Sequence, residues 1–514
     1  MNGAESLIRT LVRADVTSCF ANPGTSEIHL VQALDHVPEM RCVLGLFEGV
    51  VTGAADGYAR MAGKPACTLL HLGPGLGNGL ANLHNANRAQ VPIVNIVGQH
   101  ASHHLPHDTP LTSDVEGIAR LYSKWVRTST NASTVGSDVA EAVVSARTAP
   151  GRISTLILPA DVAWSENGSI AALPPLSQPA MPSTQAIDQA IIMLRSGLPT
   201  AILLSGDGLY GTGLATAGRI ASATGAKLFA PYPVTRLERG AGLAVVERVA
   251  YVLEQGIDQF KEFRQLILVG AEVPRAYFAY PGKDSCFLPR ECRLHTLATA
   301  SEDRVSALAA VAEAFSSPKA DTSTPKPERP DLPHGEITLP GIAGVVGALL
   351  PENVIVIDES MTSGRGMMAA TKGAPQHDWL GNTGGSIGIA LPLAVGAAVA
   401  CPDRPVLCLT ADGSGMYTLQ ALWTMAREGL NVKTVVFANN DYAVLKREFS
   451  YLGAGQPGPR VRDMFEIGRP DLDWVLLAKG MGVPGIRVNS LEEFANALRG
   501  AFVRQGPMLI EVPL

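Results

Sequence analysis

The chain has 514 residues, of which 46% are hydrophobic and 17% charged, enough for two to four domains that each bury a core. A net charge of −6 without a basic run argues against nucleic-acid binding, and the lack of an apolar run of about 18 residues argues against a membrane span. The seven cysteines lie mostly in apolar runs without metal-type spacing, and the first residues do not resemble a signal peptide. We therefore expect buried, reduced thiols in a cytoplasmic protein.

Taken in order, three segments alternate predicted strands with helices. Residues 1–165 carry strands at 16–20, 41–47, 66–71, 91–98 and 155–158, and a small-residue-rich helix near 49–59. A Pro- and Ser-rich linker, 165–185, leads to residues 186–315, with strands at 201–205, 227–229 and 265–269. A second Pro-rich linker, 316–340, leads to residues 341–514, with strands at 353–357, 405–409, 433–437 and 508–511. The sequence predicts three doubly wound parallel-sheet α/β domains.

Polar residues follow two neighbouring strands of the third domain. Asp412, Gly413 and Ser414 come after strand 405–409, and strand 433–437 delivers Asn439 and Asp441. Open α/β sheets bind ligands at the carboxyl ends of their strands. A few protein oxygens in this arrangement suit Mg²⁺ holding a polyphosphate, whose charge the nearby backbone amides would meet. An isolated Asp-Gly-Ser is more typical of a plain turn, so the two strand ends together carry the prediction.

This region resembles the cofactor motif of thiamin diphosphate enzymes, Gly-Asp-Gly-Ser followed about two dozen residues later by Asn-Asn. Ala411 replaces the first glycine, and Ala438 replaces the first asparagine. The resemblance implies thiamin diphosphate and Mg²⁺ as cofactors. It assigns the metal to Asp412, Asn439 and Asp441, with Asn440 as the alternative to Asn439.

The first domain carries further matches. Glu48 opens segment 47–60, which resembles the family's Glu-(x)n-Ala-x-Gly-Tyr-Ala pattern. A glutamate at a helix start is usually there for the helix dipole, but the resemblance implies that Glu48 bonds N1′ of the cofactor's aminopyrimidine and promotes ylid formation. Segments 22–27 and 70–78 are closest in motif to benzoylformate decarboxylase, which implies Thr25 and His71 on the substrate side. That enzyme's second histidine falls near 276–278, where this chain has Tyr277 and Phe278.

Two other patterns in the first domain have weaker interpretations. Glycines between 73 and 79 follow a strand like a dinucleotide fingerprint, but no acidic partner stands in the expected context. His100, His103, His104 and His107 lack the carboxylates or cysteines that would complete a metal site. His107 falls near the His-His pair of pyruvate decarboxylases and is a minor catalytic candidate, while the other three are expected to be surface loop residues.

In the third domain, Thr362 follows a strand and offers a hydroxyl to the diphosphate. Segment 384–392 resembles the family's Gly-x-(bulky)-Gly-x-Ala-Leu-Pro. There the carbonyl matching Gly385 accepts the 4′-amino proton, and the residue matching Ile387 wedges under the cofactor. The implied cofactor-binding set is Glu48, Thr362, Gly385, Ile387, Asp412, Gly413, Ser414, Asn439, Asp441 and Tyr442. The charged run 446–448 is expected to be a solvated face; the alternative is that Glu448 edges the site and disfavours benzoylformate.

The resemblance covers the whole chain and implies a lyase or transferase acting on a small 2-keto acid. The keto acid would lose CO₂ to give an enamine, which is protonated to an aldehyde or captured by a second carbonyl compound. It also implies a homodimer or homotetramer with sites between subunits. One alternative is an acetolactate synthase-like carboligase with bound FAD, which the short central domain disfavours. The other, a catalytically inactive cofactor-binding paralogue, is disfavoured by Glu48, Asp412 and Asn439 together.

Overall fold

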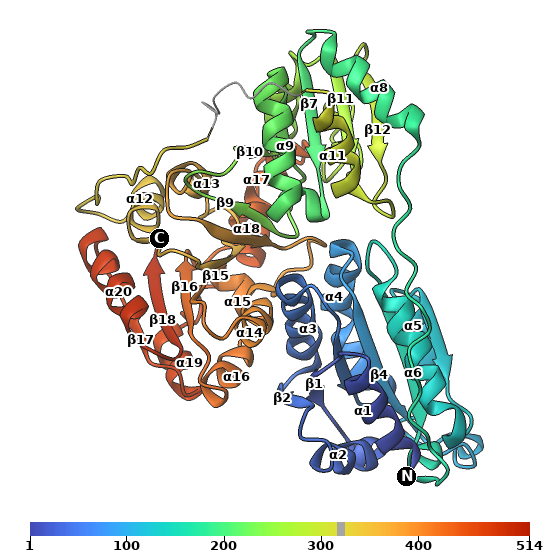
Figure 1. The fold of residues 1–514 in the computed structure, drawn as a ribbon. Helices are drawn as coiled ribbons and strands as arrows, with labels where there is room; N and C mark the ends of the chain where they lie inside the picture. The colour runs from blue at the N-terminus through green and yellow to red at the C-terminus, as the bar shows by residue number, and fades with distance from the viewer. Residues whose placement is uncertain (316–323) are drawn as a thin grey trace.

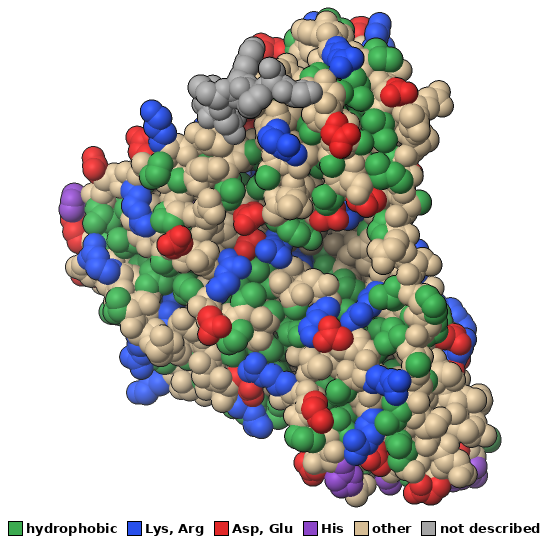
Figure 2. Space-filling view, in the orientation of Figure 1, with side chains coloured by type: hydrophobic (Ala, Val, Ile, Leu, Met, Phe, Trp, Pro, Cys, Tyr) green, Lys and Arg blue, Asp and Glu red, His purple; other side chains and the backbone are tan. Residues whose placement is uncertain are grey.

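The computed structural model describes residues 1–315 and 324–514, which form three α/β units around three sheets (Figure 1). The first unit lies at the lower right of the view in blue to cyan, the central unit at the top in green to yellow, and the third at the left in orange to red. The predicted fold class is confirmed. On the face shown in Figure 2, acidic and basic side chains are interspersed.

The first unit is built on a six-stranded parallel sheet. Three of its inner strands, β3, β4 and β6, are buried at every position, as expected where helices cover both faces. The spatial order is β2 (Arg41–Leu44), β1 (Ser18–Asn22), β3 (Ala66–Leu70), β4 (Ile93–Gln99), β6 (Ile153–Pro159) and β5 (Trp125–Thr128). The helices are α1 (Gly3–Arg13), η1 (Thr25–Glu27), α2 (Ile28–Asp35), α3 (Glu48–Ala62), α4 (Leu72–Ala89), η2 (Leu105–His107), α5 (Val115–Arg120), α6 (Ala132–Arg147) and α7 (Ala160–Trp164).

The central unit has a five-stranded parallel sheet. The order is β10 (Val246–Arg248), β8 (Lys227–Ala230), β7 (Thr200–Leu204), β11 (Gln265–Val269) and β12 (Arg293–Ala298). Its helices are α8 (Thr184–Arg195), η3 (Gly206–Leu209), α9 (Gly211–Thr224), α10 (Leu253–Phe260) and α11 (Arg304–Glu313).

The third unit has a seven-stranded sheet, parallel except at one edge, where β9 from the central segment pairs antiparallel with β14. The order is β17 (Gly485–Arg487), β18 (Met508–Pro513), β16 (Val432–Ala438), β15 (Val406–Ala411), β13 (Ile355–Glu359), β14 (His377–Gly381) and β9 (Leu237–Arg239). Its helices are α12 (Leu339–Leu349), α13 (Met367–Ala370), α14 (Ala390–Ala400), α15 (Asp412–Gly415), α16 (Ala421–Arg427), α17 (Ala443–Tyr451), α18 (Pro459–Phe465), α19 (Trp474–Gly480) and α20 (Leu491–Val503).

The segments predicted as linkers have little regular structure. In 165–185 the chain forms one isolated bridge, between Ala180 and Glu302, before α8 begins at Thr184. Of 316–340, residues 316–323 lie outside the described residues, and 324–338 form neither helix nor strand. No helix in the two described stretches is long and apolar enough to cross a membrane. All seven cysteines are free; Cys42, against expectation, is exposed.

The glycine-rich stretch after β3 is not the phosphate-binding turn of a dinucleotide fingerprint but the first half of α4. Its glycines bring neighbouring groups close to the helix. A β-carbon on Gly75 would lie 3.1 Å from Glu48 Oε1, and one on Gly79 would lie 2.9 Å from Thr52 Cγ2. The small residues therefore serve close packing of α3 against α4.

Helix α3 also packs against α14 of the third unit, side by side in Figure 1. A β-carbon on Gly57 would overlap the carbonyl oxygen of Leu393, and one on Gly396 would overlap that of Ala54. One hydrophobic core runs through both units at this contact. The first and third units of a single chain are therefore joined by two backbones in direct contact.

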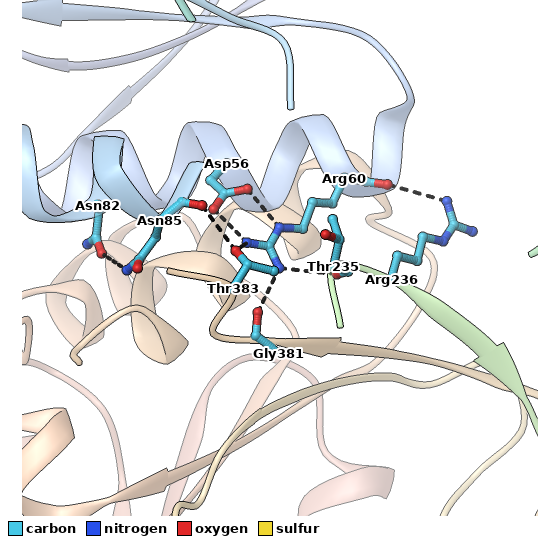
Figure 3. A network of polar contacts seen from close by, with 8 residues as sticks. All are labelled: Asp56, Arg60, Asn82, Asn85, Thr235, Arg236, Gly381 and Thr383. Atoms are coloured by element: carbon cyan, nitrogen blue, oxygen red, sulfur yellow. Dashed lines mark hydrogen bonds and ion pairs between the residues drawn. The ribbon is translucent and has the colours of Figure 1, made fainter. Parts of the chain in front are cut away.

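Arg60, near the end of α3, fixes the same junction (Figure 3). Its guanidinium makes two 2.7 Å contacts with the Asp56 carboxylate, and both side chains are fully buried. It also donates hydrogen bonds to the carbonyls of Gly381 (2.8 Å) and Thr235 (3.1 Å) and to Thr383 Oγ1 (3.1 Å). One side chain of the first unit thus binds backbone from both other segments.

Candidate active site

The first half of the site lies where the strands of the first sheet end. Thr25 follows β1, Glu48 follows β2, His71 follows β3 and His100 follows β4. Since β2, β1, β3 and β4 are neighbours in that order, these side chains share one edge of the sheet. Thr25 is exposed, and His107 ends η2 as an exposed residue farther along the β4 loop.

Glu48 is the first residue of α3 and is 7% exposed. Its Oε2 accepts a 2.9 Å hydrogen bond from Asn78 Nδ2 of α4. The missing side chain at Gly75 leaves room beside Oε1. One carboxylate oxygen is therefore held by an amide, while the other adjoins space that a glycine keeps open.

His71 has a partner that the sequence motifs did not single out. Its Nδ1 lies 2.7 Å from Glu27 Oε2, which also accepts a 2.8 Å hydrogen bond from Gly24 N. Glu27 is fully buried, which raises the pKa of its carboxyl, and its Oε1 has no hydrogen-bond partner among the described residues. With Nδ1 donating to Glu27, His71 keeps Nε2 for the open side of the site. Glu27 closes the 22–27 motif, so its position after a buried strand was the available signal.

The second half of the site lies at the carboxyl ends of β15 and β16. Asp412 is 1% exposed, and burial raises the pKa of its carboxyl. Its oxygens accept hydrogen bonds from the amides of Gly413 (2.7 Å) and Asn440 (2.6 Å). The backbone thus fixes the carboxylate at the point where the two strand ends meet.

The two asparagines after β16 point to different partners. Asn439 Oδ1 accepts a 3.1 Å hydrogen bond from Asp441 N, whereas Asn440 Nδ2 donates to Asp471 Oδ1 at 2.9 Å. Asp441 pairs through Oδ2 with Lys446 Nζ, and its buried Oδ1 lacks a hydrogen-bond partner in the described part of the chain. The side chain of Asn440 is therefore already engaged away from the site.

These donors fit a small hard cation. A carboxylate and an amide oxygen are hard ligands, and Mg²⁺ usually completes its octahedron with phosphate oxygens and water. Among the described residues no group of three or more His, Cys, Asp or Glu side chains could hold a metal ion. The residues thus fit a cation bound together with a diphosphate rather than by protein alone. Gly413 allows Tyr442 to pack closely, because a β-carbon there would lie 2.7 Å from Tyr442 Cε1.

The loop 382–388 completes this half. Gly385 has a φ of +80°, which favours glycine, and Ile387 beside it is half-buried. Helix α4 holds the loop, because His84 Nε2 lies 3.0 Å from the Gly384 carbonyl and Asn85 Nδ2 donates to the Ser386 carbonyl at 2.8 Å.

Two further groups support the loop. Glu359 accepts 3.0 Å hydrogen bonds from Gly388 N and Ala390 N, and burial raises its pKa to about 7. The Tyr277 ring lies 3.2 Å from the position of a β-carbon on Gly385, so this tyrosine covers the loop from the central unit.

A cleft of about 800 Å³ adjoins this edge between the central and third units. Thr362, half-buried, lines it together with Arg248, Arg447 and Tyr251. The expectation that 446–448 is a solvated face is wrong for Glu448, which is 7% exposed. Its carboxylate accepts a 2.9 Å hydrogen bond from the Tyr280 hydroxyl and lies 3.4 Å from Arg447 Nη2, because α17 packs against the central unit.

Arg304 fills the place where the central unit would bind a dinucleotide. The strand order reverses between β7 and β11, and doubly wound sheets bind nucleotides in the crevice at such a point. A β-carbon on Gly206 would lie 2.9 Å from Arg304 Cζ, and one on Gly270 would overlap Arg304 Cδ. Arg304 Nε also binds Asp207 Oδ1 at 2.6 Å. An ion-paired arginine therefore occupies the crevice.

Within one chain α3 and α4 start in the first half of the site and contact the third unit farther along. His71 caps the start of α4, while His84 and Asn85 bind loop 382–388 farther along the same helix. Glu48 starts α3, while Arg60 binds Gly381 near its end. At roughly 1.5 Å per residue, each of these helical stretches spans about 18 Å.

Comparisons with known proteins agree with this division. Residues 1–118 match the family model "Thiamine pyrophosphate enzyme, N-terminal TPP binding domain", and residues 363–512 match "Thiamine pyrophosphate enzyme, C-terminal TPP binding domain". The provisionally named acetolactate synthase large subunit IlvX of Mycobacterium tuberculosis (strain ATCC 25618 / H37Rv) is 52% identical, over 100% of this chain and 99% of its own.

Two more distant matches also cover the whole chain. Benzoylformate decarboxylase of Pseudomonas aeruginosa is 27% identical over 98% of this chain and 97% of its own. The solved structure of the Rhodococcus jostii RHA1 thiamine diphosphate-dependent 4-hydroxybenzoylformate decarboxylase superposes with a TM-score of 0.86 at 24% identity, covering 100% of this chain and 99% of that one. The latter likeness shows a common fold.

Proposed function

Because the chain belongs to the family of thiamine pyrophosphate (thiamin diphosphate) enzymes that includes acetolactate synthases and benzoylformate decarboxylases, we propose that it decarboxylates a 2-keto acid with Mg²⁺ as second cofactor. The product is an aldehyde, or a ligation product with a second carbonyl compound. The observation that carries the proposal is the buried Glu48, held by Asn78 at a strand end inside a thiamine pyrophosphate-binding domain.

Bound thiamin diphosphate supplies a carbon nucleophile and an electron sink for the loss of CO₂. The chain's own residues bind and orient it. Glu48 shares a proton with the aminopyrimidine, and His71, oriented by Glu27, together with Thr25 serves the substrate side, with His107 as a minor candidate. The residues assigned to the cofactor and metal are Thr362, Gly385, Ile387, Asp412, Gly413, Ser414, Asn439, Asp441 and Tyr442.

A complete site needs two copies of the chain. Glu48 and Gly385 are both assigned to one pyrimidine ring, yet within one chain the bonds from α4 to the loop beside Gly385 are made by His84 and Asn85, farther along the helix than His71. A homodimer, or a homotetramer of two dimers, solves this if each copy supplies the Glu48 half to its partner's Asp412 half.

The substrate is a short or polar 2-keto acid rather than benzoylformate. Glu448 is buried with Tyr280 and Arg447 beside the proposed cofactor edge. A phenyl ring entering there would displace or desolvate paired charge, at a cost of several kcal/mol.

Acetolactate synthase-like carboligation is the second candidate, favoured by the 52% identical relative. Arg304 in the central crevice argues against FAD in that case.

The test is complementation between two inactive variants. Glu48→Gln and Asp412→Ala should each lose CO₂ release from a panel of 2-keto acids with thiamin diphosphate and Mg²⁺. Co-expressed with different tags and purified as mixed dimers, they should recover about half of the wild-type activity, because one of the two sites then has both intact halves. Mass spectrometry of the products identifies the keto acid and separates aldehyde from ligated product. Mixed dimers as inactive as either parent would refute the shared site, and a wild type that releases no CO₂ would refute the function.

A further inference from the structure

Three histidine rings lie in series along the loop that follows β4. The ring centroids of His100 and His104 are 5.4 Å apart, and those of His104 and His107 are 5.5 Å apart. His100 and His104 are half-buried, and His107 is exposed. At these ring separations one water can bridge neighbouring imidazoles. His103, in the same loop, is exposed and takes no part in these ring contacts.

The inner end of this series follows the strand next to the one that leads to His71. Strands β3 and β4 pair in register as far as Leu70 and Val97, so His71 stands opposite Gly98, and His100 follows two residues later. Burial, then the charge of His104, then that of His71 lower the pKa of His100. The charges of His104 and His71 therefore both act on His100. His71 Nδ1 in turn contacts the carboxylate of the buried Glu27. Thr109 Oγ1 lies 3.4 Å from His100 Nε2.

The proposed reaction needs a proton in every cycle. Conversion of a 2-keto acid to an aldehyde turns R–CO–COO⁻ and one H⁺ into R–CHO and CO₂. The bond to the carboxylate breaks, its electron pair stays with the former carbonyl carbon, and that carbon takes up the proton. A donor inside a closed site must then be reprotonated from solvent before the next cycle.

We propose that His107, His104 and His100 form a proton relay that recharges His71 from solvent. This inference rests on the proposed decarboxylation. His71 gives the Nε2 proton to the carbon that loses CO₂ and becomes neutral, while its Nδ1 stays bonded to Glu27. His100 passes a proton to His71, His104 to His100 and His107 to His104, and water or buffer reprotonates His107. Each ring ends the cycle in its starting state, and one solvent proton has entered the aldehyde.

The relay explains a feature that a plain surface loop leaves unexplained. Surface histidines have no reason to lie in ring contact in a series that runs from the exposed His107, through the half-buried His104 and His100, toward a buried carboxylate. A metal site is not the reason either, because the described residues hold no group of three His, Cys, Asp or Glu that could bind a metal ion. Imidazole is the side chain best suited to both accept and donate a proton near neutral pH.

The first test needs no cofactor and no activity. His104→Asn interrupts the series in the middle, and His103→Asn is the matched control in the same loop. Histidine ring NMR on selectively labelled, cofactor-free protein follows the titration of His100. Loss of the His104 charge should move the His100 midpoint upward, and His103→Asn should leave it in place. An unchanged His100 midpoint in His104→Asn overturns the relay.

The second test measures how the product is partitioned. With the holoenzyme, one 2-keto acid and a fixed concentration of aldehyde acceptor, His104→Asn should lower the ratio of released aldehyde to ligated product about tenfold, since carbon protonation loses its proton supply. Added imidazole should restore aldehyde release in His104→Asn and leave His103→Asn unaffected. An unchanged ratio, or a lowered ratio without imidazole rescue, overturns the relay alone. Absence of CO₂ release by the wild type overturns the proposed function and the relay with it.

Discussion

Replacing Arg60 by alanine tests how the first unit is joined to the rest of the chain. The guanidinium neutralises Asp56 through two 2.7 Å contacts, and both side chains are fully buried. Arg60→Ala leaves the Asp56 carboxylate buried without its partner and removes donors from the carbonyls of Gly381 and Thr235. Breaking a buried ion pair on one side costs about 3–5 kcal/mol. That is a large part of the 5–15 kcal/mol typical of a folded domain.

The assay is equilibrium urea unfolding followed by circular dichroism. Arg9→Ala is the matched control, because Arg9 pairs with Glu5 at 2.8 Å one helical turn away but remains partly exposed, and it should cost no more than about 0.5 kcal/mol. The double variant Asp56→Leu/Arg60→Met should recover most of the loss, since it buries no charge. A loss below about 1 kcal/mol in Arg60→Ala, or a double variant as unstable as the single one, would refute the reasoning.

Three further predictions follow from single sites. Gly57→Ala should destabilise the fold by about 1–3 kcal/mol in urea unfolding because the new methyl overlaps a carbonyl of α14, whereas Gly77→Ala, in open space on α4, should be neutral or slightly stabilising. Asn439→Ala should weaken Mg²⁺-dependent retention of thiamin diphosphate, measured by calorimetry, more than Asn440→Ala; the reverse ranking would place the ligand one position later. Burial lowers the pKa of His377 to about 4, so its neutral folded state binds fewer protons than the unfolded chain. The free energy of unfolding of the wild type, relative to that of His377→Gln, should therefore fall by about 1.4 kcal/mol per pH unit as the pH drops from about 6.5 to 4. A difference in thermal unfolding that stays constant over this pH range would contradict the prediction.

The long buried strands were predictable because their sequences carry the whole signal. Strands such as β4 and β16 are apolar runs buried on both faces, and no tertiary contact is needed to recognise them. The strands that were not predicted, β5, β9, β10, β12, β14 and β17, are mostly short or contain charged residues, and several lie at sheet edges. Such strands exist because a neighbour offers hydrogen bonds, which a single sequence does not display.

Only the site residues that stand within recognisable motifs could be predicted from the sequence. Glu48, Asp412 and Asn439 stand in patterns with fixed spacing, so their strand-end positions could be inferred. The pairing of Glu27 with His71 could not be inferred, because Glu27 ends η1 after β1 while His71 follows β3, and their contact depends on the order β1–β3 in the sheet. For Glu448 the prediction itself was wrong. Its charged neighbours predicted an exposed side chain, whereas the side chain is buried and bonded to Tyr280 of the central unit. The sequence showed that His100, His104 and His107 lie close together along the chain, but not that their rings are neighbours in the fold.

The strand β9 limits how this polypeptide can be cut into independently expressed pieces. It belongs by sequence to the central segment, yet it pairs with β14 and covers one margin of the third sheet, with Leu237 fully buried. A fragment that starts at residue 341 leaves β14 with unsatisfied backbone groups along its outer side, and such margins recruit other chains. A soluble fragment of the C-terminal half must therefore begin upstream of β9 and carry the central unit with it.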